Sequence, residues 1–169
     1  MKKVFSVILV CLLCAAILAG CDTQKVEQEP MSQMVAMGNP WSDWDSVEEA
    51  EAAAGFSFEL PEVIAGNYTA AAFRTMNNEM IEIIYRDGDL EVCVRKQKGE
   101  GQDISGDYNQ YDTCTEENVN GAAVTYYRNS GNSAVKQLIS YKGYSWSVVA
   151  TDGYRGDPET DFVSAILGQ

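Results

Sequence analysis

The 169-residue sequence contains no histidine, which removes the commonest general base and the commonest metal ligand of proteins. Histidine-dependent triads, imidazole metal sites and imidazole pH switches are therefore excluded. Basic residues are also scarce, with 12 lysines and arginines against 25 acidic residues. Binding to nucleic acid or to anionic lipid depends on clusters of basic side chains, so neither function is expected.

No apolar run is long enough to span a bilayer. The longest, Val4 to Leu18, has about 15 residues where a spanning helix needs roughly 20. It follows Lys2 and Lys3, a layout typical of a secretory signal peptide. The run ends in Leu18-Ala19-Gly20-Cys21, which resembles the bacterial lipobox. The resemblance implies cleavage before Cys21 and a diacylglyceryl anchor on its thiol, and the alternatives are an ordinary secretory signal or a membrane helix.

Three segments follow from this interpretation. Residues 1–20 are predicted to be a lipoprotein signal peptide, and residues 21–40 the lipidated N-terminus with a polar, flexible tether. Residues 41–169 are predicted to form one domain, because 46% hydrophobic and 22% charged residues suit a single folded core. The protein is expected on the extracytoplasmic face of the cell membrane.

The domain is predicted to be α+β. Ser46-Val47-Glu48-Glu49 has the form of a capping box, so a helix should run from Ser46 to Ala54 and end at Gly55. Alternating apolar residues predict a strand over Phe56–Leu60. Asp157-Pro158 predicts the start of a C-terminal helix whose apolar face is formed by Phe162, Val163 and Ile166.

The middle of the chain reads as a curved antiparallel β-meander. Asp87-Gly88 and Asn120-Gly121 are signals of type I′ hairpins, and Lys142-Gly143 is a third turn. The expected strands are Tyr68–Thr75, Met80–Arg86, Leu90–Arg95, Thr113–Val119, Ala122–Arg128, Val135–Tyr141 and Tyr144–Thr151. A sheet of six or seven strands should result, with both helices packed on one face.

Short motifs in a fixed order resemble the DUF4367-type extracytoplasmic domains of Gram-positive bacterial lipoproteins. The motifs are Glu48-Glu49-Ala50, Gly55-Phe56, Leu60-Pro61, Gly66-Asn67-Tyr68, Ile84-Tyr85, Asp103 to Asn109, Val119-Asn120-Gly121 and Tyr141 to Ser147. The resemblance implies no assigned molecular role, and no cofactor is predicted. The chain carries no sigma-binding portion or membrane helix of anti-sigma type, so a direct transcriptional role is not expected.

Two cysteines fall inside the predicted domain. Cys93 alternates with Glu91 and Arg95, and Cys114 alternates with acidic neighbours, so both thiols should point to a polar face. An exported domain can keep a disulfide, so a bond between Cys93 and Cys114 is predicted, with two free thiols as the alternative. A redox-active pair is disfavoured because the spacing is not C-x-x-C.

The segment Gly99–Asp112 is the longest connection within the domain, and long connections are often functional. Tyr108, Asn109 and Tyr111 combine aromatic area with amide hydrogen bonding, so they are the candidate ligand-binding residues. Alternatively, the tyrosines pack back on the sheet and keep the segment compact. The acidic turns lack the spacing of an EF-hand, so no metal site is predicted.

Catalytic residues are not predicted, because the serines have no histidine partner and neither S-x-x-K nor G-x-S-x-G occurs. The sequence therefore favours a non-enzymatic binding or sensing module held to the membrane by the anchor on Cys21. The alternatives are a carboxylate-dependent hydrolase of envelope glycans, and a structural partner of another envelope protein.

Overall fold

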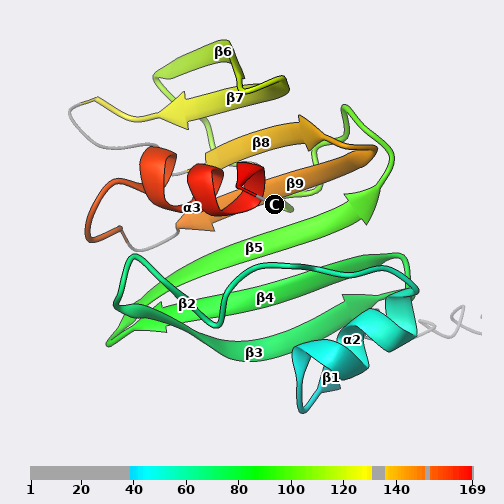
Figure 1. Ribbon diagram of the computed structural model, residues 1–169. Coiled ribbons are helices and arrows are strands. Elements are labelled where there is room, and N and C mark those ends of the chain that lie inside the picture. Colours follow the sequence, from blue (N-terminus) through cyan, green and yellow to red (C-terminus); the bar gives the residue numbers. More distant parts are fainter. Residues whose placement is uncertain (1–38, 131–135, 151–152, 169) are drawn as a thin grey trace, which may run out of the picture. The chain divides into compact units, whose positions relative to one another are not determined.

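The computed structural model describes residues 39–130, 136–150 and 153–168, which belong to one compact unit spanning residues 38–169 (Figure 1). The predictions about the signal peptide, Cys21 and the tether lie outside the described residues. Nine strands and two helices occur there: β1 (Trp41–Trp44), α2 (Val47–Ala54), β2 (Val63–Ile64), β3 (Tyr68–Met76), β4 (Met80–Asp87), β5 (Leu90–Lys98), β6 (Thr113–Val119), β7 (Ala122–Arg128), β8 (Lys136–Tyr141), β9 (Tyr144–Ala150) and α3 (Pro158–Leu167).

Helix α2 forms where the capping signals place it. The Ser46 hydroxyl accepts a hydrogen bond from the N–H of Glu49, and Gly55 ends the helix with a positive φ of 71°. The Glu49 carboxylate reaches back one residue further than expected, because it accepts from the N–H of Asp45. Local sequence therefore fixes both ends of α2.

Helix α3 begins at Pro158 as predicted, and Phe162, Val163 and Ile166 are buried. Phe162 packs edge-on against the rings of Tyr68 and Tyr85, with centroids 6.0 and 5.5 Å apart. These contacts join the last element of the chain to the first hairpin of the sheet.

The sheet is antiparallel throughout, as predicted, but it is not one continuous meander. The strand order is β1-β3-β4-β5-β9-β8-β7-β6, with β2 pairing beside β3. Strands β3–β5 form one meander and β6–β9 form a second, and the two meet where β5 pairs with β9. Sequential hairpin signals specify each meander but not the strand pairing that joins them, which is why the prediction failed at this point.

The predicted count of six or seven strands is also wrong. Strands β1 and β2 are short additions at one edge of the sheet, and both pair with β3. The expected strand over Phe56–Leu60 does not form, although Phe58 is fully buried and packs 5.3 Å from the ring of Trp146. The alternation here reflects an irregular segment that buries Phe58 against the sheet, and not a paired strand.

The turns agree with two of the three hairpin signals. Asn120 and Gly121 both have positive φ, 51° and 88°, as a type I′ turn requires, and Lys142-Gly143 is similar. The first hairpin is displaced by one residue, because Asp87 pairs with Leu90 and the turn is Gly88-Asp89. Only Gly88 has a positive φ there, so this turn is not type I′.

Both helices lie on the same face of the sheet, which we call the helix face (Figure 1). One core cluster contains Ala50 and Ala54 of α2 together with Phe162 and Ile166 of α3. Its floor is made of apolar side chains of the sheet, including Ile81, Ile83, Tyr85, Val92, Val94, Val124, Ile139, Trp146 and Val148. The packing of both helices on one face is therefore confirmed.

Candidate binding site

The opposite face of the sheet is crossed by residues 99–112, which we call the strap, and we call this face the strap face. Strand β6 lies at the far edge of the sheet, so the chain leaving β5 must cross β9, β8 and β7 to reach it. Early in this crossing, the N–H groups of Gly101 and Gln102 donate to the hydroxyls of Ser140 and Ser145, at 2.9 and 3.0 Å. Within the strap, Ile104 and Ser105 are buried.

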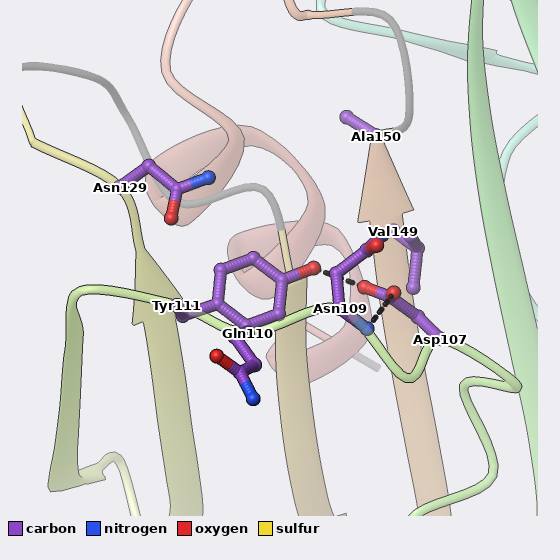
Figure 2. A pocket seen from close by; sticks show the side chains of 7 residues that line it. All are labelled: Asp107, Asn109, Gln110, Tyr111, Asn129, Val149 and Ala150. Atoms are coloured by element: carbon purple, nitrogen blue, oxygen red, sulfur yellow. Dashed lines mark hydrogen bonds between the residues drawn. The ribbon is translucent and has the colours of Figure 1, made fainter.

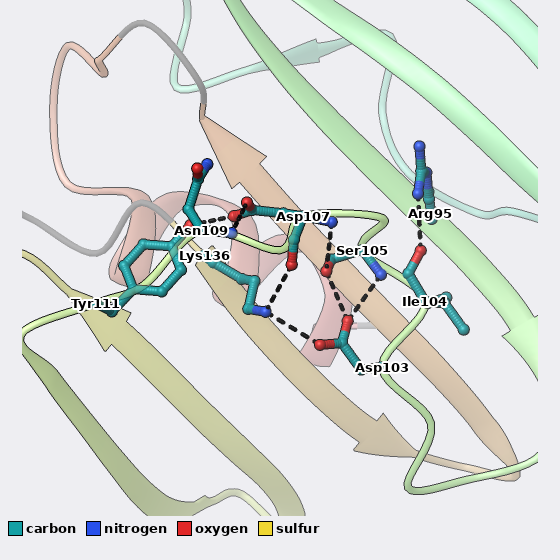
Figure 3. A network of polar contacts seen from close by, with 8 residues as sticks. All are labelled: Arg95, Asp103, Ile104, Ser105, Asp107, Asn109, Tyr111 and Lys136. Carbon is teal, nitrogen blue, oxygen red and sulfur yellow. Dashed lines mark hydrogen bonds and ion pairs between the residues drawn. The ribbon is translucent and has the colours of Figure 1, made fainter.

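Lys136 of β8 holds the middle of the strap (Figure 3). Its ammonium lies 3.0 Å from Asp103 Oδ2 and donates to the carbonyl of Asp107 at 3.2 Å. The same ammonium lies 4.4 Å from the ring centroid of Tyr127, and the residue is 5% exposed. A buried ammonium requires partners of this kind, so the strap is tied to β8 by the need to satisfy one charge.

A second set of contacts joins the strap to β5. Arg95 Nη1 donates to the carbonyl of Ile104 at 3.0 Å, and its Nε lies 2.7 Å from the carboxylate of Glu82. Gly106 has a positive φ and passes so close to Arg95 that a Cβ at residue 106 would collide with the guanidinium. The glycine therefore permits both the turn and the close approach.

Short side chains shape the strap from within. Asp103 accepts hydrogen bonds from the N–H and hydroxyl of Ser105, and the Ser105 hydroxyl accepts from the N–H of Asp107. Burial alone would raise the pKa of Asp103, but these bonds and the ammonium of Lys136 hold that pKa below its ordinary value. Asp103 is therefore an ionised anchor of the strap.

The three predicted binding residues have different fates. Tyr111 packs back on the sheet with its ring centroid 5.5 Å from that of Tyr127, and its hydroxyl donates to Asp107 Oδ2. Burial and this hydrogen bond raise the pKa of Tyr111, so the phenol stays protonated. Tyr108 is 95% exposed. The alternative that the tyrosines pack back on the sheet therefore holds for Tyr111 and not for Tyr108.

A pocket of about 230 Å³ opens beside the strap (Figure 2). It is lined by Asp107, Asn109, Gln110, Tyr111, Asn129, Val149 and Ala150. The predicted residues Asn109 and Tyr111 therefore meet in one pocket, whereas Tyr108 does not line it. Asp107 Oδ1 accepts from the N–H of Asn109, which fixes the backbone at the pocket wall.

Sequence reasoning missed Asn129, Asp107 and Lys136. Asn129 follows β7, 18 residues beyond Tyr111, and only the strap crossing brings the two together. Asp107 lies in one of the acidic turns, for which the sequence predicts no metal site. Lys136 carried no usable signal, because the apolar Leu138 shares its side of β8 and the polar Gln137 lies on the other side.

The predicted disulfide between Cys93 and Cys114 is not formed, and both thiols are free. The side chains do share the strap face, as expected, but three strands lie between them. The row runs from Cys93 through Val149, Lys136 and Tyr127 to Cys114. Four strand spacings amount to roughly 19 Å, far beyond the 7 Å that a disulfide can bridge.

Cys93 belongs to a buried polar cluster. Its thiol donates to Glu82 Oε2 at 2.9 Å, and Glu82, 1% exposed, also pairs with Arg74 and Arg95. Both guanidinium groups lie over the ring of Trp41, at 5.3 and 5.1 Å. Burial, with Glu82 nearby, raises the pKa of Cys93, so this thiol is unreactive near neutral pH.

Among the described residues, no group of three or more acidic or cysteine side chains is arranged to hold a metal ion. Nor does any helix within the described part of the chain combine the length and apolarity that crossing a membrane requires.

No family model matches the chain, and no curated protein or solved structure matches it significantly. The resemblance to DUF4367-type domains therefore stays a prediction.

Proposed function

We propose that this protein is a lipid-anchored extracytoplasmic lipoprotein whose domain binds a small, uncharged, hydroxyl-rich ligand such as a single sugar residue. The observation that carries the proposal is the pocket beside the strap, where three amide side chains meet the phenol of Tyr111: Asn109, Gln110 and Asn129. The DUF4367-type resemblance and the lipobox motif at Cys21 are consistent with this setting.

The lining chemistry selects the ligand class. An amide side chain both donates and accepts hydrogen bonds, which matches a hydroxyl group that does the same. A net charge of −13 disfavours anionic ligands. The volume, about 230 Å³, lies below the range of roughly 300–1,000 Å³ that is usual for drug-sized ligands, so the occupant is small.

The strap preorganises this pocket. Lys136 and Arg95 fix the backbone on its N-terminal side through Asp103, Ile104 and Asp107. Residues held in place before binding lose less conformational entropy when the ligand arrives. A long loop that is tied down by buried charges is therefore a suitable binding element.

Saturation-transfer NMR on the full chain in detergent micelles tests the proposal, with glucose, N-acetylglucosamine and short N-acetylglucosamine oligomers as probes. We expect transfer to at least one sugar, lost in Asn109→Ala and retained in Tyr108→Ala. The two residues are neighbours, but only Asn109 lines the pocket. Absence of transfer to every probe, or an unchanged signal in Asn109→Ala, would overturn this assignment.

The same spectra address the hydrolase alternative. Retaining and inverting glycosidases use two carboxylates, whereas Asp107 is the one carboxylate among the described residues that line this pocket. Oligomers that shorten with time would favour the hydrolase, and oligomers that stay intact would favour binding alone.

The anchor has a separate test. Intact mass of the protein purified from native membranes should show loss of residues 1–20 and a diacylglyceryl adduct at Cys21. A Cys21→Ala variant should lose the adduct and leave the membrane fraction. An unmodified N-terminus beginning at Met1 would refute the lipoprotein proposal without bearing on the pocket.

A further inference from the structure

The outer edge of β6 has no partner strand among the described residues. In the strand order β6 lies at the end of the sheet, where it pairs with β7. Its residues Thr113 to Asn118 are all exposed. An exposed strand edge presents unpaired N–H and C=O groups on which another extended chain can build.

The hairpin turn identifies which backbone groups face outward. The type I′ turn at Asn120-Gly121 makes Val119 and Ala122 a hydrogen-bonded pair, and hydrogen-bonded pairs recur at every second residue of an antiparallel ladder. Thr113, Thr115 and Glu117 therefore bond to β7. The backbone groups of Cys114, Glu116 and Asn118 point away from the sheet.

Strand β6 lacks most of the features by which proteins prevent edge strands from pairing with another chain. The strand has seven residues, contains neither proline nor lysine, and pairs with β7 without a bulge. The charges it carries are Glu116 on the strap face and Glu117 on the helix face. Two copies paired antiparallel about the centre of β6 would place Glu116 opposite Glu116, which disfavours self-association.

A hollow of about 420 Å³ adjoins this edge on the strap face. Glu116 stands at its β6 side, Asp103 stands at its strap side, and the small side chains of Ala123 and Thr125 form part of its floor. A residue directly opposite Glu116 on an added strand would project its side chain onto this same face. A lysine or arginine at that position would meet the carboxylate of Glu116, whereas the carboxylate of Asp103 across the hollow already pairs with Lys136.

We infer that β6 is a docking edge for an extended, basic segment of another envelope protein, which adds to the sheet as a tenth strand. Backbone bonds to Cys114, Glu116 and Asn118 supply the register, and a basic side chain over the hollow supplies the charge match. The site is distinct from the pocket beside the strap, so the sugar proposal can fail without affecting it, while the envelope origin of the partner rests on the proposed lipid anchor.

A synthetic nine-residue peptide of alternating threonine and lysine, capped at both ends, is the probe. We expect it to bind the full chain in detergent and to slow amide exchange at Cys114, Glu116 and Asn118. Amide exchange at Thr115 and Glu117 should stay unchanged. Exchange that slows elsewhere, or no binding at millimolar peptide, would overturn the inference.

Two controls separate strand addition from charge attraction. A peptide with N-methyl groups on alternate amides keeps every charge but can donate no hydrogen bonds along one of its edges. Of the two possible methylated registers, the one whose methylated edge faces β6 should bind at least tenfold more weakly. Glu116→Lys should weaken the lysine peptide at least tenfold and strengthen a threonine–glutamate peptide. Equal binding of both methylated registers, or a stable dimer of the free protein through β6, would contradict the proposal.

Discussion

Lys136 Nζ lies 3.0 Å from Asp103 Oδ2 although the two residues are 33 positions apart, and this ion pair ties the strap to the centre of the second meander. The lysine is buried, whereas the aspartate side chain is 46% exposed. Solvent therefore screens the pair from one side only. The contact fixes the position of the chain that leads to the pocket.

Lys136→Met should release the strap. The variant removes two hydrogen bonds from a charged donor, so we expect unfolding free energy to fall by about 1–3 kcal/mol and proteolysis to occur first within residues 99–112. Urea denaturation and limited proteolysis measure both effects. Arg86→Met, which breaks the exposed Arg86–Glu91 pair, should change stability by less than about 1 kcal/mol. Equal effects of the two substitutions would contradict the anchoring role.

Acid should loosen the strap through Asp103. Its pKa is below the ordinary value in the folded protein, so the unfolded chain takes up the proton at higher pH, near about 3.9. The resulting stability is present above that pH and is lost as the pH falls through the lower, folded pKa. Asp103→Asn should therefore flatten the loss of stability between about pH 5 and 2. Asp89→Asn, at an exposed turn, should leave the slope unchanged.

Alkylation should distinguish the two cysteines of the domain. Cys114 is exposed on β6, whereas Cys93 is hydrogen-bonded to Glu82 and its pKa is raised by burial. In native protein at pH 8 without reductant, iodoacetamide should modify Cys114 and spare Cys93, and in urea it should modify both. Peptide mapping by mass spectrometry reads the result. Protection of both thiols until a reductant is added would instead indicate the disulfide that the fold argues against.

Glu82→Gln should be strongly destabilising. The substitution leaves the guanidinium groups of Arg74 and Arg95 without their shared carboxylate, and removal of one partner from a buried pair typically costs about 3–5 kcal/mol. Thermal unfolding should show a large fall in Tm. Glu91→Gln, in an exposed pair with Arg86, is the matched control and should stay close to wild type. A small effect of Glu82→Gln would mean that water reaches the cluster.

Much of the architecture can be predicted from short stretches of sequence. Ser46 and Gly55 delimit α2, Asn120-Gly121 sets the second hairpin, and alternation identifies Ile81, Ile83 and Tyr85 as core residues. Each signal acts within a few residues, through capping, turn geometry or side-chain period. Such effects can be evaluated without knowing where the rest of the chain lies.

The site was only half predictable. The composition of the strap pointed to Asn109 and Tyr111, and both line the pocket. Asn129, just after β7, and Lys136, on β8, come from other parts of the chain. The predicted Cys93–Cys114 bond fails because β9, β8 and β7 separate the two cysteines. Proximity of residues on different strands depends on strand order, which turn signals do not encode.

Sequence alone thus determined the two helices, the hairpins within each meander and the apolar face that the helices cover, since these follow from local propensity and periodicity. The tertiary structure decided that β5 pairs with β9. That single pairing sends the strap across the polar face, separates the cysteines, gathers the pocket residues and leaves β6 at an open edge. The choice depends on long-range burial of the whole apolar face, a property of the folded chain that no short segment carries.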